Sequence, residues 1–289
     1  MFTRSKNRIS LKILNFLPPH NAWVDAFCGS ASITFAKDLA PIEIINDLDD
    51  QIVNFFEQLR NNRDALIESI LLTPYASSEY QLSRIEDFDI SSLEKARRFA
   101  VRTMMTVNGA YGKTSAGFSF SQSYSRNNIE ARVNRLNNLP DRLIPIAERL
   151  KNVRIEKRDA RNLLKMYINR PATLVYLDPP YLTKRSHKYN HDVNYEEFHE
   201  ELLDICNSAK CMIVLSGYNS DLYEKNLKSS YGWVKSTIET KTRGTKGGDN
   251  LREEIIWQNK YTISAINTGK VPISLSSSEI KDRKFNPER

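Results

Sequence analysis

Short apolar stretches rich in β-branched and aromatic residues recur towards both ends of the chain. They are Trp23–Phe27, Ile42–Ile45, Val153–Ile155, Leu174–Leu177, Cys211–Leu215 and Glu254–Trp257. Several are almost continuously apolar, which is typical of strands buried on both faces. Amphipathic helical patterns lie between them, for example after Asp49 and Asp50 and through Phe198, Leu202 and Cys206. This alternation predicts an α/β fold with a mostly parallel sheet and crossover helices.

The middle of the chain has a different pattern. Between about residues 61 and 150 we find helical periodicity at 65–72, 93–107, 129–136 and 143–150, and no convincing buried strand. Residues 108–126, rich in Gly, Ser and aromatic side chains, are interpreted as a loop or hairpin. The pattern predicts a discontinuous domain, residues 1–60 and 151–265, interrupted by a mainly helical insert, residues 61–150. We expect the tail, residues 266–289, to be partly disordered.

Composition excludes several classes of protein. With 289 residues, 40% hydrophobic and 10% aromatic, the chain is too apolar to be a disordered polymer. No apolar run approaches the roughly 18 residues needed to cross a bilayer, and the first residues lack the apolar core of a signal peptide. Three cysteines without a CxxC pair do not make a disulfide framework. These features predict a cytoplasmic protein in a reducing compartment.

Positive charge is concentrated in one segment. The net charge is +7, yet residues 95–151 alone hold eleven Lys and Arg against three acids. Such a cluster is expected where a protein contacts the phosphates of a nucleic acid. A solvated basic helical surface explains the charge equally well. Charge alone therefore leaves the two readings balanced.

The sequence LVYLDPPYL, residues 174–182, is the strongest chemical motif. A buried strand ends directly in Asp178-Pro179-Pro180-Tyr181. In open α/β sheets ligands bind beyond the carboxyl ends of strands, and two prolines make this turn rigid. The turn offers a carboxylate, the Pro179 carbonyl and an aromatic ring, which together can hold a planar amino-heterocycle. The alternative is a stiff turn with a solvated Asp.

A second motif is WVDAFCGSAS, residues 23–32, followed by IIND, residues 44–47. We expect a strand, a turn at Gly29 and then a helix, with Asp47 ending the next strand. A glycine turn followed about twenty residues later by an acid has the geometry of a nucleotide-type site. With one glycine the motif is weak alone, and an ordinary strand-turn-helix is the alternative.

Taken together, the motifs resemble the Dam-like adenine-N6 DNA methyltransferases. Their order is the same: an N-terminal lysine motif at Ser5-Lys6, the glycine turn at Gly29, Asn46-Asp47, the basic insert and Asp178-Pro179-Pro180-Tyr181. LSGYNSDLY, residues 215–223, and REEIIWQN, residues 252–259, also match. Ala31 stands where the family has a second glycine. The resemblance covers roughly residues 2–260.

The resemblance implies a Rossmann-like methyltransferase domain, S-adenosylmethionine as cofactor and double-stranded DNA as substrate. The implied cofactor residues are Phe2, Lys6, Asp25, Phe27, Gly29, Asp47, Asp159 and Asp178. The implied catalytic residues are Asp178, Pro179 and Tyr181. In the insert and the loop after the DPPY turn, the residues expected to contact DNA are Arg97, Arg98, Arg102, Asn108, Lys113, Arg126, Lys184 and Arg185.

The predicted mechanism is direct methyl transfer to an adenine that has left the duplex. The base stacks on Tyr181, and its N6 amine donates to the Asp178 carboxylate and the Pro179 carbonyl. These acceptors stabilise the positive charge that grows on nitrogen during attack. No metal is required.

Alternatives come from other classes. An RNA base-amine methyltransferase can carry a DPP-aromatic turn, but the long basic insert disfavours it. The intact DPPY turn disfavours a catalytically silent DNA-binding protein, and the missing G-x-G-x-x-G disfavours a dinucleotide dehydrogenase. We expect a monomer or weak dimer, bacterial or phage-encoded, with no membrane contact. A cognate restriction endonuclease acting separately is a candidate partner.

Two further stretches are basic or rich in histidine. His187, His191 and His199 follow the DPPY turn, and we interpret them as parts of a solvated loop rather than as zinc ligands. KTRGTKGGDN, residues 241–250, is interpreted as a flexible hairpin, with DNA contact as the lesser alternative.

Overall fold

A seven-stranded sheet forms the centre of the molecule. A computed structural model of the chain describes residues 4–107, 117–121, 125–126, 128–180, 195–243 and 249–272. In sheet order the strands are β5 (Val153–Glu156), β2 (Ile42–Asn46), β1 (Ala22–Asp25), β6 (Thr173–Leu177), β7 (Met212–Gly217), β9 (Asp249–Gln258) and β8 (Val234–Arg243). The first five are parallel, and β9 runs antiparallel to both of its neighbours. The predicted α/β class with a mostly parallel sheet is confirmed.

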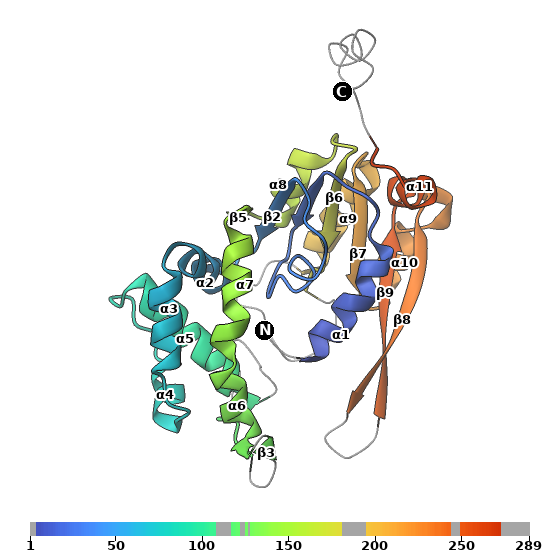
Figure 1. The fold of residues 1–289 in the computed structure, drawn as a ribbon. Coiled ribbons are helices and arrows are strands. Elements are labelled where there is room, and N and C mark those ends of the chain that lie inside the picture. The colour runs from blue at the N-terminus through green and yellow to red at the C-terminus, as the bar shows by residue number, and fades with distance from the viewer. Residues whose placement is uncertain are drawn as a thin grey trace.

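Helices cover both faces of this sheet (Figure 1). One face carries α8 (Ala160–Tyr167), α9 (Tyr195–Ser208) and α10 (Asp221–Asn226), and the other carries α1 (Arg4–Ile13) and α11 (Lys260–Thr268). Short 3₁₀ helices span Leu14–Phe16 and Ser229–Tyr231. Every residue of β1, β6 and β7 is buried, because side chains that alternate along these strands meet a helical layer on either side. This explains why their sequences are almost continuously apolar.

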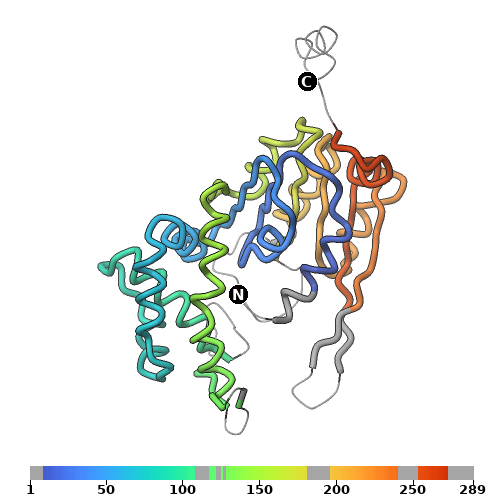
Figure 2. Tube along the Cα trace, in the orientation of Figure 1, coloured from blue at the N-terminus to red at the C-terminus, as the bar shows by residue number. Residues whose placement is uncertain are grey.

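The helical insert lies to one side of the sheet, as Figure 2 shows. It follows α2 (Asp50–Asn61) and contains α3 (Arg63–Leu71), α4 (Ser77–Leu82), α5 (Ser92–Met105), α6 (Ala131–Asn137) and α7 (Leu139–Leu150). Among its described residues the only strands are β3 (Ser125–Arg126) and β4 (Ile129–Glu130), which pair over two residues, and neither residue of β4 is buried. Its apolar core continues into the sheet through Ile45 and Val153. This core also includes α2, which lies before the predicted domain boundary at residue 60. That boundary stays a prediction.

A buried ionic cluster joins the end of the insert to the sheet. Glu43 of β2 is 1% exposed and accepts hydrogen bonds from Lys37 Nζ at 2.6 Å and from Arg149 Nη2 at 2.8 Å. Arg149, in the last turn of α7, also donates to the Lys37 carbonyl at 2.7 Å. A buried carboxylate is tolerated when its lone pairs are satisfied in this way. The cluster therefore fixes α7 against β2.

Strands β8 and β9 extend beyond the rest of the sheet. The last residue of β7, Gly217, pairs with Ile255, so Asp249–Glu254 of β9 pair only with Ile238–Arg243 of β8. We call these two segments the hairpin arm. It projects from the carboxyl edge of the parallel strands, and the insert extends in the same direction on the other side of that edge (Figure 1). The sequence prediction of a hairpin here was correct, but two ten-residue strands form most of it.

The C-terminal helix α11 runs to Thr268, slightly past the predicted domain end at residue 265. Gly269 ends it with φ +64°, the left-handed conformation that glycine adopts most easily. The rest of the tail, residues 273–289, lies outside the described residues. Within the described ranges, no helix has both the length and the apolar character that a membrane crossing needs.

Candidate active site

The order of the strands reverses between β1 and β6, and the carboxyl ends of these two strands lie side by side at that point. From β1 the chain continues to β2 on one side, whereas β6 and β7 lie on the other side. In open α/β sheets such a switch point leaves a crevice in which ligands bind. Asp25 is the last residue of β1, and Asp178 follows directly after β6. Two acids predicted as site residues are thus brought together at this crevice.

A cavity of about 520 Å³ occupies the crevice, and we call it the larger cavity. Its wall includes three carboxylic acids: Asp25 at the end of β1, Asp178 directly after β6, and Glu254 within β9. Phe27 and the 28–33 segment form another side, and α1 contributes Ile9, Ser10 and Ile13. Acidic, hydroxyl and apolar groups all face this one space.

The Asp25 side chain is fixed by a short chain of hydrogen bonds. Its Oδ2 accepts from Thr34 Oγ1 at 2.7 Å, and that hydroxyl accepts from Trp23 Nε1 at 2.8 Å. Asp25 is only 2% exposed. Because Trp23 and Thr34 are also buried, the carboxylate is oriented by the core rather than by solvent.

The turn at Gly29 is stabilised by Asp47. Gly29 has φ +49°, and its N–H donates to Asp47 Oδ2 at 2.9 Å. Asp47 Oδ1 accepts from the Asp49 N–H at 3.0 Å, and burial raises the pKa of the Asp47 carboxyl. Asp47 is not part of the wall of the larger cavity. The structure thus joins the glycine turn and Asp47 by a direct hydrogen bond, and their role at a nucleotide-type site stays a prediction.

Ala31 also lies in the left-handed region, with φ +49°. This conformation costs a residue with a Cβ about 1–2 kcal/mol. The family that the sequence resembles has glycine at this position. The helix expected after the turn does not form. Residues 31–37 make turns instead, because the positive φ at Ala31 interrupts the helix and Thr34 is bonded to Asp25.

Asn46 connects the end of β2 to the segment that carries Asp159. Its Nδ2 donates to the carbonyls of Ala26 and Arg158 at 2.9 and 3.0 Å, and its Oδ1 accepts from the Arg158 N–H at 2.8 Å. The sequence interpretation used Asn46 only as part of a motif. Its position at a strand end, fully buried and polar, is the signal that indicates such a cross-link.

Asp159 is the N-cap of α8 and accepts from the Arg161 N–H at 2.8 Å. The Arg161 guanidinium also pairs with its carboxylate at 2.6 Å, which lowers the pKa of Asp159. Arg161 stacks over the ring of Phe198, 4.8 Å from its centroid, and Phe198 in turn meets Phe27 edge-on at 6.2 Å. Asp159 is therefore connected to the wall of the larger cavity through Arg161 and two aromatic rings.

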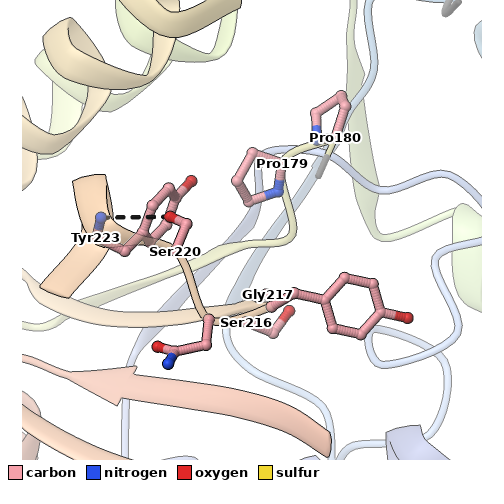
Figure 3. Close-up of a pocket in the computed structure, with 8 residues that line it drawn as sticks. Pro179, Pro180, Ser216, Gly217, Ser220 and Tyr223 are labelled. Carbon is pink, nitrogen blue, oxygen red and sulfur yellow. Dashed lines mark hydrogen bonds between the residues drawn. The ribbon is translucent and has the colours of Figure 1, made fainter. Parts of the chain in front are cut away.

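The DPPY turn separates the larger cavity from a second one. Pro179 and Pro180 line a cavity of about 280 Å³, the smaller cavity, together with Ser216–Ser220 and Tyr223 (Figure 3). Ser216 lines both cavities and shares a 2.7 Å hydrogen bond with the hydroxyl of Tyr176. The Ser220 side chain caps α10 by accepting from the Tyr223 N–H. Asp178, Pro179 and Pro180 thus run from one cavity to the other.

Several predicted site residues cannot be placed in this geometry. Outside the described residues lie Phe2, Asn108, Lys113, Tyr181, Lys184 and Arg185. Lys6 belongs to α1, the helix that contributes to the larger cavity, and Arg126 belongs to β3. The roles of all eight stay predictions.

The arginines of α5 are engaged within the insert. Arg97 pairs with Glu94 at 2.7 Å and with Glu79 at 2.8 Å, and Arg98 pairs with Glu94 at 2.8 Å. Arg102 contacts Gln51 and the Ser83 carbonyl. The side chains of Arg97 and Arg98 are only 13% and 12% exposed. Their contact with DNA stays a prediction, and the structure adds a role in holding α5 to α4.

Sequence reasoning missed some residues of the site and misplaced one. Ser216 and Glu254 line the larger cavity, and both stand in the motifs 215–223 and 252–259 that had been noted without roles. His199 was interpreted as part of a solvated loop. It is instead 1% exposed within α9, because it lies on the apolar stripe of that helix with Leu202, Leu203 and Cys206. His187 and His191 lie outside the described residues.

Comparison with known proteins identifies the family. The model of the D12 class N6 adenine-specific DNA methyltransferases matches residues 4–245. The chain belongs to this family. The predicted resemblance and the predicted enzyme class are confirmed: this is an adenine-specific DNA methyltransferase, and the family implies a methyl donor of the S-adenosylmethionine type.

Individual similarities are more distant. The methyltransferase is 27% identical over 265 residues to the Type II methyltransferase M1.LlaDCHI of Lactococcus lactis subsp. cremoris, covering 85% of this chain and 88% of that protein. A precorrin-6y C5,15-methyltransferase from Geobacter metallireducens GS-15 aligns with TM-score 0.38 and 11% identity over 89% of this chain and 88% of that one. A precorrin 8W decarboxylase from Methanobacterium thermoautotrophicum also has TM-score 0.38, with 9% identity over 89% and 90%. Such TM-scores are too low to support a functional inference.

Proposed function

We propose that this methyltransferase binds S-adenosylmethionine in the larger cavity and a flipped adenine in the smaller one, and transfers the methyl group directly between them. The observation that carries the proposal is the DPPY turn, which follows a buried strand at the switch point of the sheet and contributes to both cavities. The methyl donor and the base that accepts the methyl group would then lie on the two sides of one turn and meet at Asp178.

The larger cavity fits the proposed cofactor chemically. When bound, S-adenosylmethionine supplies a methyl group on a positively charged sulfonium, and it also carries an ammonium group, ribose hydroxyls and an adenine ring. Asp25, Asp178 and Glu254 give the wall the negative charge that favours such a cation. Ile9 and Phe27 offer apolar surface for the ring. Asp47 does not line the larger cavity itself, so we propose that the ribose extends past the Gly29 turn to reach it. A carboxylate has about four acceptor positions, which leaves Asp47 capacity for a ribose hydroxyl beyond its bonds to the protein backbone.

The smaller cavity suits a single planar base. Its space of about 280 Å³, part of it open to solvent, lies between Pro179, Pro180 and Tyr223. An adenine there would place its N6 amine beside the turn, where the Asp178 carboxylate and the Pro179 carbonyl can both accept hydrogen bonds from it. The lone pair of an aromatic amine is delocalised into the ring, and two acceptors favour the tetrahedral nitrogen that attacks. Holding the amine in line with the methyl group supplies most of the remaining acceleration.

The target adenine must leave the duplex to reach this cavity, because its amine is paired inside the helix. We propose that the duplex lies across the carboxyl edge of the sheet, between the insert and the hairpin arm. The basic segment 95–151 supports the insert as the main source of phosphate contacts. The arm begins at Glu254, which lines the larger cavity, and its three basic residues, Lys241, Arg243 and Arg252, stand among four acids. Its proposed contact with DNA therefore rests on its position rather than on net charge.

The relative M1.LlaDCHI is named a Type II methyltransferase. We propose the same role for this enzyme, namely protection of DNA from a restriction endonuclease that acts as a separate protein. We further propose that it acts in the bacterial cytoplasm as a monomer or weak dimer.

The proposed function is tested by incubating the purified enzyme with S-adenosylmethionine carrying a radioactive methyl group and with unmethylated genomic DNA. Digestion to nucleosides and mass spectrometry should find the label as N6-methyladenine. Label in added RNA and none in DNA would favour the RNA alternative. DNA binding without transfer to either would favour a catalytically silent protein.

A further inference from the structure

His199 lies beside the smaller cavity, and the proposed reaction gives it no role. It is 1% exposed in α9, and its Nδ1 is 2.7 Å from the Tyr223 hydroxyl of α10. The Pro180 carbonyl lies near the ring and raises the pKa of His199 against the larger effect of burial. Both partners line the smaller cavity, Pro180 from the turn after β6 and Tyr223 from α10 (Figure 3). One buried side chain therefore bridges two segments of the cavity wall.

The partners determine how the ring is protonated. A proline backbone has no N–H, so the Pro180 carbonyl can only accept a hydrogen bond. A neutral imidazole has one donor nitrogen and one acceptor nitrogen. Nδ1 shares a hydrogen bond with the Tyr223 hydroxyl. When Nδ1 accepts in that bond, the other ring nitrogen carries the proton and can donate towards the Pro180 carbonyl. Burial lowers the pKa of His199 to about 4, so this neutral form persists at neutral pH.

We propose that His199 is a positioning residue that holds Pro180 and Tyr223 at a fixed separation and so sets the place of the target base beside Asp178. The proposal rests on the proposed function, because it requires the base to occupy the smaller cavity. His199 touches neither base nor cofactor. It acts through the turn, whose position decides whether the amine lies in line for transfer, and a shift of about 1 Å at such a point can cost on the order of 100-fold in rate.

The neighbouring residue on α9 strengthens the argument. Phe198 contacts Phe27, which lines the larger cavity, whereas His199 contacts the wall of the smaller one. Adjacent residues of one helix thus contact the walls of both cavities. A buried polar side chain that is hydrogen-bonded to a cavity wall is costly to keep for packing alone, since an apolar residue would fill the same space.

The experiment compares His199→Ala, His199→Gln and Tyr223→Phe with the parent enzyme. Transfer to unmethylated genomic DNA is measured in a single turnover at saturating S-adenosylmethionine, and DNA affinity is measured separately. His199→Ala should slow transfer by about 10-fold or more with little change in DNA affinity. Tyr223→Phe, which keeps the ring and removes the hydroxyl, should also slow transfer. His199→Gln should recover part of the rate, because its amide offers both a donor and an acceptor.

His20→Ala is the matched control. His20 Nδ1 lies 2.7 Å from the carbonyl of another proline, Pro18, but it precedes β1 at the opposite edge of the sheet. It should lower thermal stability and leave the single-turnover rate unchanged. If His199→Ala behaves like His20→Ala, the proposal is overturned and His199 only stabilises the core.

Two further outcomes are separated by the same set of variants. If His199→Ala does not fold, Tyr223→Phe decides, and a parental rate in that variant overturns the proposal. A parent enzyme that transfers no methyl group to DNA refutes the proposed function itself. An active parent with unaffected variants refutes only the positioning role.

Discussion

Replacing Asp47 with alanine should weaken binding of S-adenosylmethionine. The carboxylate accepts the Gly29 and Asp49 N–H groups at 2.9 and 3.0 Å, and the first of these bonds holds the turn at φ +49°. A hydrogen bond to a charged group contributes about 1.5–3 kcal/mol. Losing the proposed ribose contact, together with order in the turn, should cost about 1–3 kcal/mol of binding free energy, or roughly 5- to 150-fold in Kd.

Titration calorimetry with S-adenosylmethionine measures this effect, and Asp49→Ala is the matched control. Asp49 lies two residues away and caps α2 by accepting from the Gln51 N–H at 2.8 Å. Its loss should cost about 1 kcal/mol of folding stability and leave cofactor affinity unchanged. Parental affinity in Asp47→Ala, or an equal loss in Asp49→Ala, would refute the assignment of Asp47 to the cofactor.

Three further outcomes are expected. Glu43→Ala removes the carboxylate that pairs with Lys37, whose side chain is only 4% exposed. The free energy of unfolding, measured by urea denaturation, should fall by about 3–5 kcal/mol, and a loss below about 1 kcal/mol would contradict a structural role for the cluster. Arg97→Gln should lower Tm, because Glu94 and Glu79 bind this guanidinium within the insert; an unchanged Tm would contradict that structural role. A flatter salt dependence of DNA binding in the same variant would confirm the predicted contact of Arg97 with DNA. The pKa of His199 is about 4 in the folded protein and near 6.5 in the unfolded chain, so the unfolded chain takes up the proton first as the pH falls. Between pH 7 and pH 5 the parent should therefore lose about 2 kcal/mol more free energy of unfolding than His199→Gln. Equal losses in the two proteins would contradict that pKa.

The central strands could be predicted from the sequence because both of their faces are buried. Stretches such as 174–177 and 211–215 are apolar throughout, so their period does not need to be resolved to identify them. Strand β8 was missed for the opposite reason. Its sequence VKSTIETKTR is mostly polar, and it forms only because β9 supplies a partner from further along the chain. Pairing across the chain is not visible in local periodicity.

The site was predicted in part because motif residues stand at strand ends, where topology brings them together. Asp25 and Asp178 meet for that reason. The roles of Arg97 and Arg98 were harder to judge. Glu94 stands three and four residues before these arginines, which is the spacing at which side chains pair on a helix. Because Glu94 lies just outside the basic segment 95–151, the charge of that segment overstates what these two arginines offer to DNA. Likewise, the spacing of His199 from Leu202 and Cys206 indicated a buried helix position, but its neighbouring histidines suggested a loop.

Asp178 offers the most direct test of the account. The proposal makes its carboxylate one of two acceptors for the reacting amine, and a single preorganised contact of this kind is typically worth on the order of 10²–10³ in rate. Asp178→Asn keeps the shape of the side chain and removes the negative charge. Methyl transfer to adenine should be measured in a single turnover at saturating S-adenosylmethionine, with duplex affinity recorded separately. The account predicts that Asp178→Asn and Asp178→Ala bind DNA like the parent and transfer methyl groups at least 100-fold more slowly. Transfer near the parental rate would contradict it and leave the DPPY turn with a structural role only.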